Sequence, residues 1–460
     1  MRIYESLVKK VLYPLWMVQQ GDRGIIKYLN YFDPVDHWQA AQLEQWQTQW
    51  LKNILIHAYE HTIYFKEVFD QLKFNPLQIK RVQDISLLPI LEKQTIRERF
   101  ADLTANNIKP AELLDASTGG STGIPLKFLR DQECVYLRKG QELYFDRKIG
   151  YDLGKRMAYF VSGSHYSGAI ASLKARLKNF TCERMLSFDP HDITDDYMQE
   201  FAEKFIEFRP EIVKCFPNAL IPFAEFVQKN RIELPAVKAI TCTGETLYDD
   251  QKKLLEHVFK GKVYEKVGTR ESGVIAAECL QRDGLHVFSP GVLFEILRTD
   301  GTPAAAGEIG RVILTDFFNK GMPLIRYDIG DMAVAAPGQT CPCGSPLPKI
   351  ARYLGRTRDI VIDAKGNPRP GYLFVEVIRS MNYKSQFQII QEENSLLHTK
   401  IIKQENEEID LVKIKAEFEK IVGSSFRITF EFVREIPRDP SGKYGYVISK
   451  IKKPLKLQNV

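Results

Sequence analysis

The stretch Ser117-Thr118-Gly119-Gly120-Ser121-Thr122-Gly123-Ile124-Pro125-Leu126-Lys127 places hydroxyl side chains and glycines between two apolar segments. Glycine lets backbone N–H groups approach an anion without a Cβ atom in the way, and Ser and Thr hydroxyls add donors that suit phosphate oxygens. It is not a Walker A loop, because Gly-Lys-Ser/Thr is missing and Leu126 to Leu129 look extended rather than helical. By itself, a loop of this composition is more often a turn. The sequence predicts a nucleotide phosphate loop here only because other motifs support it.

Five short motifs follow this loop along the chain. They are Gly244-Glu245-Thr246, Val267-Gly268-Thr269-Arg270-Glu271-Ser272-Gly273, Ile325-Arg326-Tyr327-Asp328-Ile329-Gly330-Asp331, Leu354-Gly355-Arg356-Thr357-Arg358-Asp359-Ile360-Val361 and Pro437-Arg438-Asp439-Pro440-Ser441-Gly442-Lys443. Each is weak singly, since Gly-Asp and Gly-Arg are also ordinary turn signals. Together and in this order, they resemble the acyl-adenylate-forming superfamily, in its phenylacetate-CoA ligase-like branch with the CapK-type proteins of surface-polysaccharide gene clusters. The resemblance covers most of the chain, from about His57 to Lys443.

Length, composition and charge limit the class of protein. The chain has 460 residues, too many for one hydrophobic core, so we expect at least two domains. Hydrophobic residues at 44% and charged residues at 27% are ordinary for a soluble globular protein. The net charge of +6 comes from basic residues scattered along the chain, so nucleic acid is not an expected partner.

Cysteine usage and hydropathy bear on location. Seven cysteines, with no N-terminal signal segment, lead us to expect a reducing cytoplasm. No segment approaches the run of about 18 apolar residues that a membrane span requires. The apolar start, Leu7 to Val18, contains Lys9, Lys10 and Pro14. A packed amphipathic helix is its simpler interpretation, and peripheral contact with a membrane surface is the alternative. The oligomeric state stays open, a homodimer included.

Hydrophobic periodicity predicts an α/β fold of helix-covered sheets. The section from 1 to 100 is predicted to be mostly helical, because apolar residues recur there at helical spacing. Strand-like and helical stretches then alternate as far as about 350. The predicted strands are Met157 to Val161, Ala239 to Thr243, Lys262 to Val267 and Leu293 to Leu297. The predicted helices are Asp195 to Phe208, Asp249 to Phe259 and, near the end, Asp410 to Val422.

The resemblance implies a large N-terminal adenylation domain at 1–354 and a small mobile α+β domain at 355–460. It assigns residues of the large domain and of the junction to ATP. These are Ser117, Gly119, Gly120, Ser121, Thr122, Gly123, Gly244, Glu245, Thr246, Gly268, Asp331 and Arg356. The loop would hold the β- and γ-phosphates, the Gly244 motif would line the adenine site, and Asp331 would accept hydrogen bonds from the ribose diol.

Three residues carry the chemistry that the resemblance implies. Glu271 would bind Mg²⁺, which prefers hard oxygen ligands. Thr269 would lie near the α-phosphate and the substrate carboxylate. Lys443 would stabilise the charge that develops as the carboxylate attacks the α-phosphorus. Val267 departs from the pattern, because most relatives have a tyrosine there that packs on adenine.

The resemblance also implies two steps and an acyl acceptor. Arg358 stands at the hinge position about which the small domain would rotate between the steps. The following Asp363 to Gly371 lacks the usual Gly-rich turn of CoA ligases, so CoA, an amine and a sugar hydroxyl all remain candidate acceptors. The pocket for the carboxylic acid is predicted to include His165, Tyr166, Phe216 and Asn218.

Cys341-Pro342-Cys343, together with Cys279 and His286, could form a tetrahedral zinc site. Free cysteines are also commonly small buried hydrophobes, and the residues alone leave both interpretations open. Some relatives carry a zinc near the end of the large domain, which favours a structural zinc; four protein ligands would leave no open position for chemistry.

The function that the sequence predicts is an ATP-dependent, AMP-forming ligase. It would activate a carboxylic acid as acyl-adenylate and pass the acyl group to CoA, an amine or a sugar, in surface-polysaccharide biosynthesis if the CapK likeness extends to function. The alternative is a nucleotide-binding accessory protein of a polysaccharide assembly without turnover. Lys443, Asp331 and Glu271 favour the enzyme, whereas Val267 and Arg358 keep the alternative open.

Overall fold

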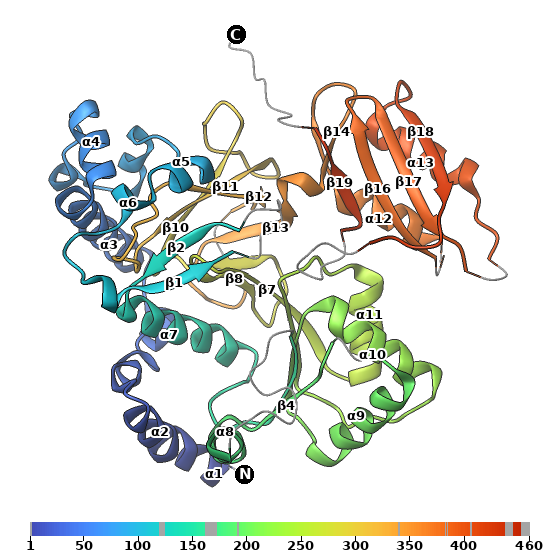
Figure 1. Cartoon of the computed structure of the whole chain (residues 1–460), viewed down its shortest axis with the longest axis horizontal. Coiled ribbons are helices and arrows are strands. Elements are labelled where there is room, and N and C mark those ends of the chain that lie inside the picture. Colours follow the sequence, from blue (N-terminus) through green and yellow to red (C-terminus); the bar gives the residue numbers. More distant parts are fainter. Residues whose placement is uncertain are drawn as a thin grey trace.

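The computed structural model describes residues 2–118, 125–161, 173–190, 193–338, 341–381, 383, 385–404, 407–437 and 445–451. It has an N-terminal helical section, a central 11-stranded sheet and a C-terminal lobe with a four-stranded sheet (Figure 1). No helix within these ranges is both long and apolar enough to cross a membrane.

The N-terminal section is mostly helical. Its α-helices are α1 (Arg2–Leu7), α2 (Tyr13–Gln19), α3 (Ala40–His61), α4 (Ile63–Leu72), α5 (Lys93–Glu98) and α6 (Phe100–Leu103). Gln39 and Gln42 form a reciprocal pair of hydrogen bonds that caps the start of α3. The buried face of α3, which includes Leu51, Ile54 and Leu55, packs against the core. The indole of Trp46 donates to the carbonyl of Pro290 at 3.0 Å, which fastens α3 to the central sheet.

A short hairpin leads from this section into the central sheet. Its strands are β1 (Leu114–Ser117) and β2 (Lys127–Arg130), which pair antiparallel on either side of the predicted phosphate loop. Lys127–Arg130 overlaps the stretch predicted to be extended, shifted by one residue. Helix α7 (Gln132–Lys148) follows, capped by the carboxylate of Asp131, which accepts from the N–H of Cys134 at 2.9 Å.

The central sheet has the strand order β10-β11-β12-β13-β9-β8-β7-β6-β5-β3-β4. The pairs from β4 to β7 are parallel and those from β7 to β10 are antiparallel. The parallel strands are β3 (Met157–Phe160), β4 (Met185–Ser187), β5 (Ile212–Cys215), β6 (Ala239–Thr243) and β7 (Lys262–Thr269). The others are β8 (Gly273–Glu278), β9 (Leu285–Val287), β10 (Val292–Leu297), β11 (Ile309–Asp316), β12 (Tyr327–Ala335) and β13 (Lys349–Arg356).

Helices connect the parallel strands because such strands need crossovers. They are α8 (Leu173–Lys178), α9 (Asp195–Phe208), α10 (Pro217–Lys229) and α11 (Asp249–Phe259). Phenylalanines of α9, α10 and α11 pack against β3 and β5 in one cluster. Helices α9 and α11 and strand β6 have the predicted bounds. Strand β3 ends one residue before the prediction, whereas β7 continues to Thr269 because Gly268 and Thr269 pair with β8.

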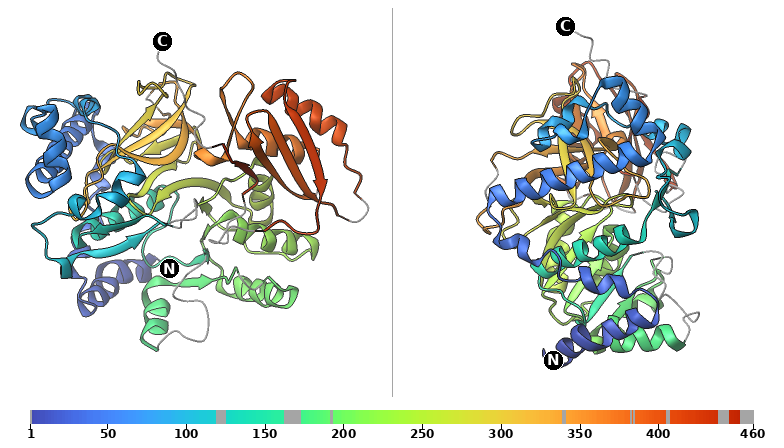
Figure 2. Two further views of the ribbon diagram at one scale, coloured as in Figure 1. Left: turned by 45° about the horizontal axis from the view of Figure 1, so that its top comes forward. Right: turned by 90° about the vertical axis from the view of Figure 1, so that its left-hand side faces the viewer.

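The C-terminal lobe lies to one side of the central sheet (Figures 1 and 2). It has a hydrophobic core of its own. Its elements are β14 (Ile360–Ile362), β15 (Pro368–Pro370), α12 (Gly371–Ser380), β16 (Gln386–Glu393), β17 (Leu396–Ile402), α13 (Leu411–Val422), β18 (Arg427–Phe432) and β19 (Val447–Ser449). Tyr248, which precedes α11, joins this core, and the guanidinium of Arg379 pairs with Asp250. The division at residue 354 stays a prediction; strand β13 of the large sheet ends at Arg356.

Candidate active site

Asp331 and Arg356 face each other across the β12–β13 pair. The hydroxyl of Tyr353 donates to Asp331 Oδ2, and Arg356 Nε lies 3.2 Å from Oδ1. Asp331 is buried, and its Oδ1 accepts no hydrogen bond from the described residues. A buried carboxylate oxygen without a hydrogen bond is costly unless a ligand donor meets it. This oxygen can therefore accept from a ligand hydroxyl, as the predicted ribose contact requires.

Glu271 lies in the turn between β7 and β8, where its carboxylate is buried. The hydroxyl of Tyr327 donates to Glu271 Oε1 at 2.9 Å. Burial, together with the negative charge of Glu271, raises the pKa of Tyr327, so the phenol stays protonated and acts as the donor. Tyr327 thus orients one oxygen of the carboxylate that the sequence assigns to Mg²⁺.

Lys93 is a residue of this site that the sequence analysis missed. Its ammonium donates to the carbonyl of Ile329 at 2.6 Å, and Arg356 donates to the same carbonyl at 3.1 Å. Burial, followed by the charge of Arg356, lowers the pKa of Lys93, while Asp331 and Glu271 oppose that shift. A Cβ atom on Gly330 would lie 2.8 Å from the Lys93 nitrogen, so a side chain there would displace the ammonium. The lysine is held against the strand that carries Asp331.

The placement of Lys93 depends on distant backbone pairing. Leu91 donates to the carbonyl of Arg326 at 2.9 Å, and Asp328 donates to the carbonyl of Leu91 at 3.0 Å. These bonds join the segment before α5 to the first residues of β12. Nothing in the sequence around Lys93 signals this contact, because it joins segments more than 230 residues apart.

The Gly244 motif meets the predicted acid pocket. Gly244 has φ +80°, and a Cβ atom on it would lie 2.7 Å from the ring of Phe216, so only glycine fits this approach. The backbone N–H of Asn218 donates to Glu245 Oε2 at 2.9 Å. Thr246 lies beside Gly355 near the end of β13, since a Cβ atom added to Gly355 would be 3.6 Å from Thr246 Oγ1.

The β7–β8 turn contacts the first residue of the predicted phosphate loop. Arg270 donates to the carbonyl of Ser117 at 3.4 Å, and Thr269 Oγ1 accepts from the N–H of Ser272 at 2.9 Å. Val267, at the position of the family's tyrosine, is partly buried against the main core. Among the described residues, these bonds bring the β7–β8 turn beside Ser117, at the first residue of the predicted phosphate loop.

Several predicted site residues lie outside the described residues. They are Gly119, Gly120, Ser121, Thr122 and Gly123 of the loop, His165 and Tyr166 of the pocket, and the lysine Lys443. Arg358 lies in the short 3₁₀ helix η8 (Thr357–Asp359) that follows β13.

Four side chains converge beside β9 and the start of β13, with their ligand atoms all within 4.8 Å of one another. They are Cys279, His286, Cys341 and Cys343. The sulfurs of Cys279 and Cys341 are 3.7 Å apart, and Cys343 Sγ lies 3.3 Å from His286 Nε2. The other ring nitrogen, Nδ1, donates to the carbonyl of Leu347 at 3.1 Å, which fixes the tautomer with Nε2 toward the sulfurs. Three sulfurs and one imidazole nitrogen are a donor set that suits Zn²⁺.

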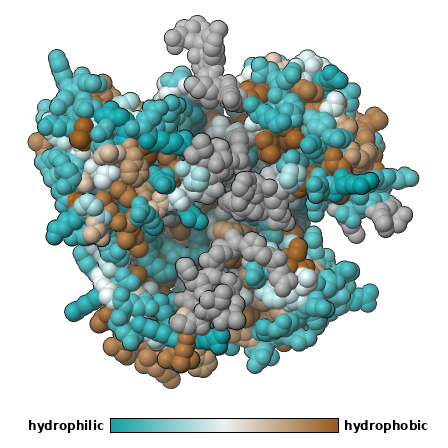
Figure 3. Space-filling view, viewed as in Figure 1, coloured by the Kyte–Doolittle hydropathy of each residue, from teal (hydrophilic) through white to brown (hydrophobic). Residues whose placement is uncertain are grey.

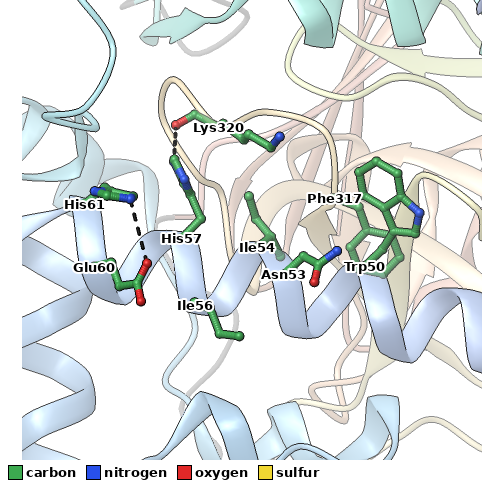
Figure 4. Close-up of a pocket in the computed structure, with 9 residues that line it drawn as sticks. All are labelled: Trp50, Asn53, Ile54, Ile56, His57, Glu60, His61, Phe317 and Lys320. Atoms are coloured by element: carbon green, nitrogen blue, oxygen red, sulfur yellow. Dashed lines mark hydrogen bonds and ion pairs between the residues drawn. The ribbon is translucent and has the colours of Figure 1, made fainter.

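A separate cavity of about 320 Å³ lies between α3 and the connection from β11 to β12 (Figure 4). Trp50, Ile54 and Phe317 give it an apolar wall, and His57 donates through Nε2 to the carbonyl of Lys320 at 2.9 Å. None of the motif residues lines it. This cavity therefore does not belong to the predicted nucleotide site.

Comparison with known proteins relates the whole chain to one group. Residues 370–450 match the CapK C-terminal domain. The chain is 23% identical over 462 residues to the protein CapK of Staphylococcus aureus. The match covers 98% of both chains. The chain is a homologue of CapK and of phenylacetate-coenzyme A ligases. The ligase of Thermus thermophilus is 21% identical to it, covering 77% of this chain and 80% of the ligase.

A solved structure supports the fold. The crystal structure of a 2-hydroxyisobutyryl-CoA ligase, in the postadenylation state with 2-HIB-AMP, superposes with a TM-score of 0.70. The match covers 89% of this chain and 90% of the ligase at 18% sequence identity. The adenylate-forming ligase fold that the resemblance implied, with a C-terminal domain, is confirmed for this CapK homologue.

Proposed function

We propose that this CapK homologue activates a carboxylic acid with ATP, forming an acyl-adenylate and pyrophosphate. One observation carries the proposal: buried Asp331, with an oxygen that accepts no hydrogen bond from described residues, stands beside Arg356, Lys93 and Glu271. Two cations and two carboxylates grouped along the first half of β12 suit a nucleotide with its metal ion. The relatives named as ligases support this class of reaction.

In the proposed reaction, Asp331 accepts from the ribose hydroxyls and so fixes the adenosine. Arg356 and Lys93 supply positive charge on the side of the site where the triphosphate would lie. The substrate carboxylate oxygen attacks the α-phosphorus, the bond from that phosphorus to the bridging oxygen breaks, and pyrophosphate leaves. We assign Lys443 to stabilising this transition state and Thr269 to the carboxylate and α-phosphate.

Glu271 is the residue that we assign to Mg²⁺. Its buried carboxylate keeps a defined orientation through the Tyr327 hydrogen bond. Mg²⁺ bound there would neutralise charge on the phosphates, and hard carboxylate oxygen suits it.

The second step would transfer the acyl group to an acceptor. The names of the phenylacetate-coenzyme A ligases support CoA as the first acceptor to test, while an amine or sugar hydroxyl remains the alternative. The resemblance to CapK-type proteins of surface-polysaccharide gene clusters, together with the match to CapK along nearly its full length, leads us to propose a place in surface-polysaccharide biosynthesis. We propose a cytoplasmic location for the enzyme, since ATP is its co-substrate.

We further propose a structural zinc held by Cys279, His286, Cys341 and Cys343. The cluster fits because all four ligand atoms converge and the histidine is already oriented by Leu347. With four protein ligands, the ion would stabilise the end of the large sheet and take no part in the reaction.

The test of the proposed activity is exchange of labelled pyrophosphate into ATP over a broad panel of carboxylic acids. Exchange should depend on one class of acid and on Mg²⁺. ATP binding without exchange for any acid of the panel would instead support the nucleotide-binding accessory protein.

A further inference from the structure

The N-terminal helix exposes an apolar stripe. The helices α1 and α2 and the π-helical segment η1 (Val8–Leu12) between them form one continuous helix over residues 2–19. Val8, Tyr13 and Met17 are buried against the body of the protein. The opposite side is apolar as well, with residues three or four apart on one face. Its exposed side chains are Ile3, Leu7, Val11, Leu15 and Val18.

A second exposed apolar segment lies beside this helix. Leu173, Leu177 and Phe180 of α8 and the adjoining π-helical turn η7 (Asn179–Glu183) are 84%, 51% and 79% exposed. Tyr4 and Trp16 hydrogen-bond to Thr181 of η7 at 3.0 and 3.3 Å, so the two segments are held together.

These two segments hold eight of the seventeen exposed large hydrophobic side chains among the described residues, so the exposure is concentrated rather than scattered. Figure 3 shows apolar surface at the lower edge of the view, where Figure 1 places α1, α2 and α8. Clusters of this kind mark interaction surfaces, whereas single exposed apolar residues are ordinary.

The exposed charges within these two segments have one sign. Exposed charged side chains of the two segments, within their described residues, are Lys10, Lys174 and Arg176. Their carboxylates are not exposed: Glu5 is half-buried, and Glu183 is ion-paired with Lys178 at 3.1 Å. An apolar face with a basic rim complements an anionic lipid headgroup layer.

We propose that this surface, residues 2–19 with 173–180, docks the protein on an anionic lipid bilayer. The helix over residues 2–19, about 27 Å long, lies in the plane of the membrane with its stripe among the upper acyl chains. The basic residues contact lipid phosphates. The protein remains peripheral, and the surface is independent of the nucleotide site.

The experiment is co-sedimentation of the full chain with vesicles of phosphatidylglycerol and phosphatidylcholine in equal parts, and with vesicles of phosphatidylcholine alone. Leu7→Glu/Leu15→Glu places charge on the stripe at residues 44% and 60% exposed, so folding is spared. Leu77→Glu/Leu87→Glu is the matched control, because these leucines, 62% and 70% exposed, lie between α4 and α5. Melting curves of all three proteins check that they fold alike.

Binding to the anionic vesicles should fall at least about tenfold in the stripe variant and stay unchanged in the control. Vesicles of phosphatidylcholine alone should bind the wild type at least about tenfold more weakly. The proposal is overturned if the wild type ignores anionic vesicles or if the stripe variant binds them equally well. Sedimentation velocity gives the remaining outcome: a wild-type dimer that the stripe variant dissociates would assign the stripe to a second copy.

Discussion

Asp331→Asn tests the assignment of the ribose site most directly. Asparagine keeps the shape of the side chain but replaces one carboxylate oxygen by an NH₂ group, which donates and cannot accept from a ligand hydroxyl. The change therefore removes one charge-assisted acceptor, worth about 1.5 to 3 kcal/mol. At about 1.4 kcal/mol for each factor of ten, ATP should bind roughly 10- to 150-fold more weakly. Isothermal titration calorimetry with ATP and Mg²⁺ measures this.

Asp328→Asn provides the matched control for this experiment. Asp328 lies three residues earlier in β12, and its carboxylate pairs with Arg311 at 3.0 Å instead of facing Arg356. This variant should bind ATP like the wild type. Asp331→Asn should change the free energy of unfolding by no more than about 1 kcal/mol, since Arg356 is 39% exposed and its ion pair with Asp331 is screened. The assignment is refuted if Asp331→Asn binds normally or if both variants lose affinity equally.

Three further predictions address the remaining groups. Lys93→Met should slow acyl-adenylate formation by about 10²-fold, the scale of one lost preorganised donor. The control Lys80→Met, on the exposed surface, should not slow this step. Equal rates for the two variants would show that Lys93 takes no part in the reaction. Lys443→Ala should slow the same step by about 10²-fold, yet spare acyl transfer from a supplied acyl-adenylate; parallel loss of both steps would contradict its assignment. Protein purified without added zinc should carry about one zinc per chain by elemental analysis, and Cys341→Ser/Cys343→Ser should lose it; unchanged metal content in the variant would reject the ligands.

Motif order predicted which parts of the chain would meet, but not how. Asp331 and Arg356 lie directly opposite because β12 and β13 pair antiparallel, with two register shifts between them. A local sequence pattern cannot predict these register shifts, because each shift depends on how the residues that connect β12 and β13 pack against the rest of the sheet. The convergence of Cys279, His286, Cys341 and Cys343 could be predicted from residue type because cysteine and histidine are chemically distinctive. A lysine is not, which is why Lys93 was missed.

The N-terminal helix shows a different limit of sequence reasoning. Its periodicity predicts a helix, and both of its faces are apolar. Which face is buried is decided by partners far along the chain, such as Leu143, Leu153 and Cys182, which pack against Val8 and its neighbours. The pattern therefore left both packing and membrane contact open, and only the three-dimensional structure shows which apolar face is exposed.

The predicted junction between the two domains is bonded directly to β12, the strand that carries the proposed ribose ligand Asp331. Arg356 donates to the carbonyl of Ile329, and Thr357 Oγ1 donates to the carbonyl of Gly330 at 3.0 Å, the residue before Asp331. Farther along, Arg379 of α12 pairs with Asp250 of α11. If the C-terminal domain turns about Arg358 as the resemblance implies, Arg356 and Thr357 lie before the pivot and stay with the ribose site, whereas the Arg379–Asp250 pair must break. The nucleotide contacts would then persist through both steps, while rotation of the small domain would move its catalytic groups toward or away from the nucleotide.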